Sequence, residues 1–240
     1  KANSGIRFIR TDLNCDIIER IVIPNYKNVS DTNMCTTIKN DYDVQISTIE
    51  HLMAALSGTG LDNVDIEING SEVPIMDGSS DQFVNLIENT GLIKLPEKRR
   101  FLKITKPVEI KDGDKKCSLS PCDKMKFFAS IDFSDKVIGK QEASVNLENF
   151  NFKNEVSKAR TFGFMQDVED LRRSGLGLGG SLENCVIIDN NEVINSEGLR
   201  FDNEFVVHKL LDAVGDIFTS GYRIQGEYKG LSLIHISEPT

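Results

Sequence analysis

Two histidines and one aspartate have the residue types and the spacing of a metal site. His208 and Asp212 are four residues apart in one predicted helix, so both side chains lie on the same face of it. His51 belongs to a second predicted helix, where the small residues Ala54 and Ala55 on the same side leave room for a ligand. Two histidines, one aspartate and a water would make a four-coordinate catalytic zinc site. The alternative is that His208 and Asp212 are a solvated pair on a helix surface.

The residue before His51 has two possible roles. As a carboxylate next to a metal ligand, Glu50 is suited to act as general base toward a water molecule. However, Ser47-Thr48-Ile49-Glu50 also matches the capping box, in which Glu50 bonds back to the backbone of Ser47. Both interpretations begin a helix at this point.

The glycine-rich segment 175–180 contains G-x-G-x-x-G, the spacing of a dinucleotide-binding loop. Such a loop follows a strand and opens a helix. Here the order is reversed, because the segment follows a predicted helix over 164–174 and leads into a predicted strand over 184–189. We therefore expect a loop and exclude a nicotinamide cofactor.

The predicted elements indicate an α+β fold, since strands cluster before helices instead of alternating strictly with them. A charged stretch with a proline at 94–100 is the best candidate linker, and we divide the chain there into domains 1–96 and 97–230. The other expected elements are strands within 4–24 and over 63–69, 101–110, 116–120 and 126–133, and helices over 47–57, 82–90 and 203–219. An Asp112-Gly113 turn joins two of these strands, and Gly91 ends a helix.

Composition narrows the possible functions. The 240 residues carry 28 basic and 37 acidic side chains, a net charge of −9, which argues against nucleic-acid binding. Five cysteines without paired spacing favour a reducing compartment, and no apolar run reaches the length of a membrane span. We expect a cytoplasmic monomer.

Five segments in the same order resemble one enzyme family. They are 47–56 (STIEHLMAAL), 72–79 (EVPIMDGS), 159–165 (ARTFGFM), 198–201 (GLRF) and 205–216 (FVVHKLLDAVGD). Together they closely resemble UDP-3-O-acyl-N-acetylglucosamine deacetylase, the zinc hydrolase of lipid A biosynthesis in Gram-negative bacteria. The resemblance implies two domains, each with a helix layer packed on a mixed sheet, and an active site between them. It also implies that UDP-3-O-acyl-N-acetylglucosamine is the substrate and Zn²⁺ the cofactor.

The resemblance further implies a role for each matching residue. His51, His208 and Asp212 match the zinc ligands, and Glu50 matches the general base. Thr161 matches a hydroxyl that polarises the substrate carbonyl or the oxyanion, and Asp216 matches a carboxylate that orients a C-terminal catalytic histidine. Phe162 and Lys209 match residues that contact the substrate. Asp77 is a candidate to support the site without touching the metal. Residues 162–195 correspond to an insert that forms an apolar passage for the acyl chain. We add Lys229 as a second basic residue for the UDP group.

The ends of the chain depart from the family pattern. Counting from Lys229 puts Ser232 where the family has its catalytic histidine, and residues 231–240 read as a non-native tail, so we expect His235 to play no part. We also expect that the first strand of the family is missing before Lys1, so that the chain is truncated at both ends and its turnover is lowered roughly 10²–10⁴-fold. One alternative is a binding module that holds the UDP-sugar or acyl chain without hydrolysing the substrate. Another is a zinc hydrolase of a different kind, such as a peptidase, but the absence of H-E-x-x-H argues against a peptidase.

Overall fold

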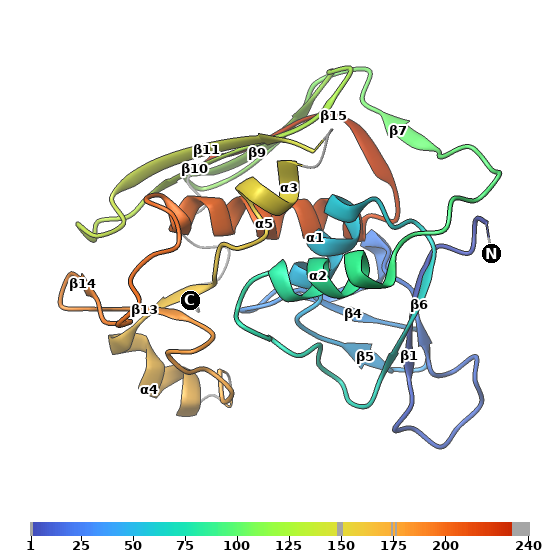
Figure 1. Ribbon diagram of the computed structural model, residues 1–240, viewed down its shortest axis with the longest axis horizontal. Coiled ribbons are helices and arrows are strands. Elements are labelled where there is room, and N and C mark those ends of the chain that lie inside the picture. The colour runs from blue at the N-terminus through green and yellow to red at the C-terminus, as the bar shows by residue number, and fades with distance from the viewer. Residues whose placement is uncertain (1, 148–150, 174, 176, 232–240) are drawn as a thin grey trace.

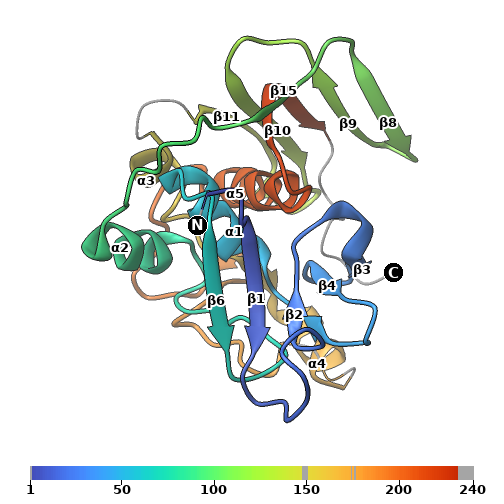
Figure 2. The same cartoon turned by 90° about the vertical axis from the view of Figure 1, so that its right-hand side faces the viewer.

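The structure is a computed structural model that describes residues 2–147, 151–173, 175 and 177–231. Within this part, helices lie between sheets, as Figures 1 and 2 show. The prediction of an α+β fold is confirmed. The expected tail lies outside the described residues except for Leu231, which ends the last strand, β15 (Arg223–Leu231).

The first half of the chain contains two small sheets and two helices. One sheet has the order β2-β1-β6, with β1 and β2 antiparallel and β1 and β6 parallel, and the other has the order β3-β4-β5. The helices are α1 (Glu50–Thr59) and α2 (Asp81–Thr90). The strands are β1 (Ile6–Arg10), β2 (Ile21–Val22), β3 (Val29–Asp31), β4 (Thr37–Lys39), β5 (Gln45–Ile46) and β6 (Val64–Ile68), with a short 3-10 helix at Tyr26–Asn28.

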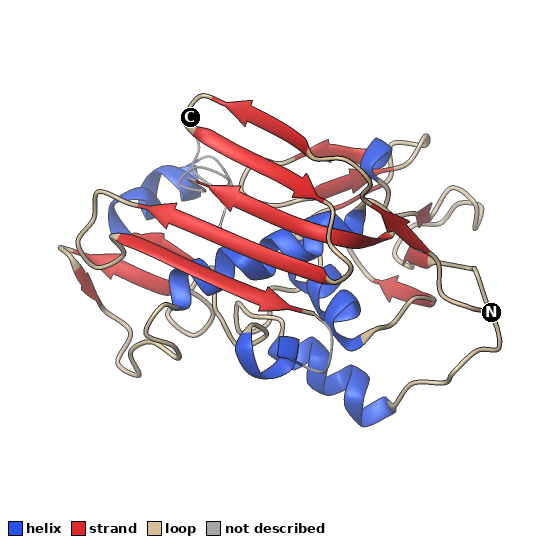
Figure 3. Cartoon of the chain, turned by 90° about the horizontal axis from the view of Figure 1, so that it is seen from above, coloured by secondary structure: helices blue, strands red, loops and turns tan. Residues whose placement is uncertain are grey.

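The second half is built on a larger mixed sheet with the order β11-β10-β15-β9-β8, which covers the helices in the view from above (Figure 3). Strands β10 and β15 are parallel, and β7 pairs in parallel with the first residues of β15. Helix α5 (Glu204–Thr219) packs under this sheet. The strands are β7 (Phe101–Lys103), β8 (Val108–Asp112), β9 (Lys115–Ser120), β10 (Met125–Asp132) and β11 (Lys140–Asn146), followed by α3 (Asn151–Glu155).

The expected insert forms a small unit of its own. Strands β12 (Phe162–Phe164), β13 (Val186–Asp189) and β14 (Glu192–Val193) pair in that order, and α4 (Met165–Arg173) precedes the glycine-rich segment. The segment therefore runs from a helix toward a strand, as predicted, although Leu176 within it lies outside the described residues.

Most predicted elements are present, with shifted ends. The turn at Asp112-Gly113 is confirmed, because Asp112 pairs with Lys115 and Gly113 has φ 56°. Gly91 also ends α2 as predicted. Strands β11 and β15 escaped prediction, although β15 lies in the middle of the large sheet.

The capping box was wrong. Helix α1 begins at Glu50 and its N-cap residue Ile49 makes no side-chain cap. The Glu50 carboxylate instead accepts from the backbone N–H of Thr36, and the Ser47 hydroxyl accepts from Thr37. A tertiary contact has replaced the local one.

Among the described residues, no helix is long and apolar enough to cross a membrane.

Candidate metal centre and cavity

Helices α1 and α5 meet because glycine stands at their contact. A Cβ at Gly215 would lie 2.0 Å from the carbonyl oxygen of Glu50 and 3.1 Å from the backbone nitrogen of Ala54. Ala54 and Ala55 are both fully buried in the core. Their small size therefore serves the packing of the two helices, whereas we had expected it to leave space for a ligand. This close approach brings His51 beside α5.

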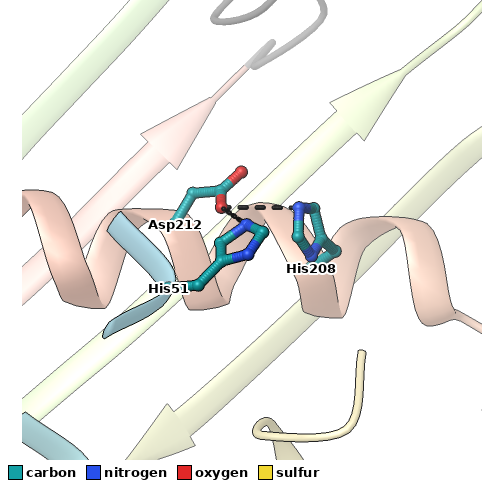
Figure 4. A group of neighbouring side chains, drawn as sticks. All are labelled: His51, His208 and Asp212. Carbon is teal, nitrogen blue, oxygen red and sulfur yellow. Dashed lines mark ion pairs between the residues drawn. The ribbon is translucent and has the colours of Figure 1, made fainter. Parts of the chain in front are cut away.

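Three side chains from the two helices point toward one another (Figure 4). The Nε2 atoms of His51 and His208 lie 3.5 and 3.4 Å from Oδ1 of Asp212. One ligand atom from each of the three residues lies within 4.8 Å of the other two, a grouping that could hold a metal ion. The structure thus brings together the three residues that the sequence analysis selected.

The backbone sets which nitrogen His208 presents to this group. Its Nδ1 lies 3.1 Å from the carbonyl oxygen of Ala159, which can only accept a hydrogen bond. Nδ1 must therefore carry the proton, and Nε2 offers its lone pair. Burial lowers the pKa of His208 to about 4, so the ring is neutral near pH 7.

The charge of Asp212 is held by its neighbours. Burial works against the carboxylate, but the adjacent His208 and Lys209 outweigh it and lower the pKa of Asp212. For His51, burial opposes the charged ring, but the Asp212 carboxylate outweighs burial and raises its pKa. Oδ1 of Asp212 and Nδ1 of His51 are buried without a hydrogen-bond partner among the described residues. A buried carboxylate oxygen left in this state is suited to a cation.

A cavity of about 260 Å³ opens beside these residues. Its acidic lining consists of Glu50, Asp212 and Asp216. Burial raises the pKa of Glu50, and burial together with the charge of Glu50 raises the pKa of Asp216 to about 7. The remaining lining residues are Val29, Thr32, Met34, Cys35, Thr36, Lys209 and Thr219.

Two further predicted residues, Phe162 and Lys209, lie close to His208, and a third, Thr161, precedes Phe162 in the chain. The Phe162 ring is 6.2 Å from the His208 ring, centroid to centroid. Nζ of Lys209 lies 5.3 Å from the centroid of Phe162 and 3.4 Å from Oδ2 of Asp212. Thr161 lies between Phe162 and the Ala159–Arg160 peptide, and its backbone N–H donates to Gly78.

Two predicted residues have their described contacts elsewhere. Asp77 forms an ion pair with Arg200 at 2.9 Å and accepts from the Ser79 hydroxyl. Lys229 is exposed on β15 and pairs with Glu227 on the same strand at 3.2 Å. Asp77 therefore supports the turn at Gly78, whose carbonyl oxygen accepts from Thr161 just before β12, while the described contacts of Lys229 do not connect it to the cavity.

Sequence reasoning missed Thr36 and Glu204. Thr36 lies in a loop without a motif, and its two contacts to acidic residues depend on the tertiary fold. Glu204 stands one helical turn before His208, which was a usable signal, but its role depends on the distant Arg160.

The chain is similar to the proteins of one family over nearly its whole length. The profile of a family described as UDP-3-O-acyl N-acetylglycosamine deacetylase matches residues 1–237. A protein of Shewanella halifaxensis named UDP-3-O-acyl-N-acetylglucosamine deacetylase is 44% identical over 229 residues, which are 94% of this chain and 74% of the relative. Proteins of the same name from Neisseria meningitidis serogroup C and Photobacterium profundum are 43% and 44% identical, covering 97% and 98% of this chain and 76% and 77% of the relatives.

Proposed function

Because the chain belongs to the UDP-3-O-acyl N-acetylglycosamine deacetylase family, we propose that it hydrolyses the N-acetyl group of UDP-3-O-acyl-N-acetylglucosamine and releases acetate. The reaction is a step of lipid A biosynthesis, and the enzyme is an amidohydrolase. The observation that carries the proposal is the convergence of His51, His208 and Asp212 from two helices, with Glu50 beside them.

The three donors suit zinc. A tetrahedron with metal–ligand bonds of about 2.0–2.1 Å has edges of about 3.3–3.4 Å. The contacts of His51 and His208 with Oδ1 of Asp212, at 3.5 and 3.4 Å, are close to that edge. Two imidazoles and a carboxylate are also ligands that zinc prefers, with one position left for water or substrate. Zinc held there would supply Lewis acidity to the amide carbonyl and to a water molecule.

Glu50 then acts as general base. The residue is 8% exposed and lines the cavity, and its carboxylate accepts from the N–H of Thr36 at 3.0 Å. Burial raises its pKa, which brings the carboxylate closer to the basicity that proton transfer near neutral pH requires. Glu50 takes the proton of the attacking water, the new C–O bond forms and the C–N bond breaks. The proton is then available to the departing amine.

The remaining predicted residues stabilise and orient the substrate. We assign the oxyanion to Thr161, whose segment borders His208, and substrate contacts to Phe162 and Lys209, which lie against each other. We assign to Asp216, which lines the cavity, the family's role of orienting a C-terminal catalytic histidine. Lys229 remains a proposal for the UDP group, and Asp77 acts indirectly through its contacts with Ser79 and Arg200.

The insert over 162–195 supports a passage for the acyl chain. Met165, Leu178 and Leu182 are exposed apolar side chains around α4 and the glycine-rich segment. An aliphatic chain that covers them would remove apolar surface from water. We also propose that the boundary at 96/97 separates two domains with the active site between them, since β7 joins the large sheet directly after it.

The setting of the reaction follows from composition. All five cysteines are free, which fits a reducing cytoplasm. The net charge of −9 argues against a nucleic-acid partner. We propose a monomer as the working unit.

Acetate release from UDP-3-O-acyl-N-acetylglucosamine by the zinc-loaded protein tests the proposal. We expect release that the Glu50→Gln variant loses while it still binds the substrate. Binding of the substrate by the wild-type protein without any acetate release would contradict hydrolysis and favour the binding-module alternative.

A further inference from the structure

One peptide group is bonded to α5 at both of its ends. The carbonyl oxygen of Ala159 accepts from Nδ1 of His208 at 3.1 Å. The N–H of Arg160, which belongs to the same peptide group, donates to Oε1 of Glu204 at 2.9 Å. Glu204 and His208 are four residues apart, one turn of the same helix. The peptide therefore links a carboxylate to the outer nitrogen of a candidate metal ligand.

The Glu204 carboxylate is held in a fixed position. Its side chain is fully buried. Oε1 accepts a hydrogen bond from Nε of Arg160 at 2.9 Å, and Oε2 accepts one from Nη2 of Arg160 at 3.2 Å. The backbone N–H of Arg200 adds a bond of 2.6 Å to Oε2. Every one of these groups is a donor, so both carboxylate oxygens act as acceptors, and Oε1 accepts from the Arg160 N–H.

A charge at one end of a peptide group affects the other end. A carboxylate that accepts from the N–H polarises the group and makes its carbonyl oxygen a stronger acceptor, because bonds in a chain strengthen one another. The outer N–H of a metal-binding histidine usually donates to such an acceptor, which fixes the ring and raises its basicity as a ligand. The Ala159–Arg160 peptide has both features, a carboxylate that accepts from its N–H and a histidine N–H that donates to its carbonyl oxygen.

We propose that Glu204 is a positioning residue for the metal ligand His208 and acts on it through the Ala159–Arg160 peptide. The inference rests on the proposed function, because it assumes that His208 binds the metal. It assigns Glu204 a chemical effect in addition to its ion pair with Arg160. A purely structural Glu204 would change the stability of the fold without changing the affinity of the folded protein for zinc.

The test is zinc affinity, measured on folded protein by competition with a chelator. Glu204→Gln replaces the negative charge with a neutral amide of the same shape, and we expect its affinity to fall roughly 10–100-fold, as for other outer partners of metal ligands. The matched control is Glu197→Gln. Among the described residues, Glu197 accepts from Nη1 of the same Arg160, whereas the Arg160 backbone N–H donates to Glu204, so the Glu197 variant should bind zinc like the wild type.

A second variant and a second measurement keep the test decisive if Glu204→Gln folds poorly. Glu204→Asp retains the charge for Arg160 but withdraws it from the peptide by one methylene, and we expect a smaller loss of roughly 3–10-fold. In zinc-loaded protein labelled at histidine, the Nδ1–H proton of His208 should also move upfield in either variant, because its hydrogen bond weakens.

The outcomes separate two failures. If the wild type binds zinc and both Glu204 variants match it in affinity and in the Nδ1–H shift, the role of Glu204 is refuted while the metal site stands. If the wild-type protein binds no zinc, the proposed metal site itself is refuted, and the role of Glu204 with it.

Discussion

Thr36 donates its hydroxyl to Oδ1 of Asp216 at 2.7 Å, across 180 residues of the chain. The backbone N–H of the same residue donates to Oε2 of Glu50 at 3.0 Å. One loop residue therefore holds the two carboxylates that line the cavity beside Asp212. Its position accounts for how two acidic groups with raised pKa values are kept in fixed places.

Thr36→Val should lower kcat about 10-fold, because Asp216 loses a buried hydrogen bond worth roughly 1–3 kcal/mol. Thr36→Ser retains the hydroxyl and should keep wild-type turnover, and both variants should bind zinc normally. Steady-state kinetics of the two variants check this. If Thr36 acts through Asp216, adding Thr36→Val to Asp216→Ala should cause no further loss, whereas additive losses would contradict the link.

Glu50→Gln should lower turnover roughly 10²–10⁴-fold, the usual contribution of a positioned base. Its amide oxygen can still accept from Thr36, and the metal ligands are unchanged, so zinc content should stay near that of the wild type. Ser47→Ala is the matched control, because Ser47 does not cap α1. A large loss of helix stability in Ser47→Ala with normal chemistry in Glu50→Gln would restore the capping interpretation.

The stability of the zinc-free protein should depend on pH through Asp216. Burial and Glu50 raise the folded pKa of Asp216 to about 7, against about 3.9 in an unfolded chain. The folded state then binds this proton more tightly than the unfolded chain does. The contribution of Asp216 to stability is therefore fully present below about pH 4 and is lost as the pH rises to about 7. The Asp216→Asn variant cannot ionise at this position and so avoids this loss of stability. It should be more stable than the wild type above pH 7 by on the order of 2–4 kcal/mol. Urea unfolding at pH 5 and pH 8 measures it, and equal pH dependence in both proteins would contradict the raised pKa.

Gly215→Ala should separate α1 from α5. Its Cβ would meet the carbonyl oxygen of Glu50 at 2.0 Å, so one helix must move. We expect a destabilisation of roughly 1–3 kcal/mol, as for other overpacked cores, together with weaker zinc binding. A Gly215→Ala variant with wild-type unfolding and zinc affinity would show that the close approach is unnecessary.

Sequence reasoning succeeded where chemistry follows local spacing. His208 and Asp212 lie on one helix, so their common face was predictable from the separation of four residues. His51 was chosen from its residue type and its small neighbours, and the resemblance to a family then supported the choice, because spacing within α1 does not say which helix it meets. The contact itself depends on Gly215, whose significance becomes visible only when α1 is seen against it.

The predictions that failed concern features that depend on contacts between distant parts of the chain. The pattern at Ser47 and Glu50 is a sound local signal, but the N–H of Thr36 competes for the carboxylate and wins in the folded chain. Strand β15 alternates weakly and follows a helix closely, and its partners β9 and β10 are more than 90 residues away in sequence. Glu204 and Arg160 likewise form their pair across 44 residues, beyond the reach of any local pattern.

The most direct test of the account is the zinc content of the dialysed protein. We predict close to one equivalent in the wild type and in a Glu227→Gln control, whose side chain pairs with Lys229 on β15, and a loss of most of it in His208→Ala. Folded wild-type protein without zinc, or a His208→Ala variant that retains it, would contradict a metal centre formed by His51, His208 and Asp212.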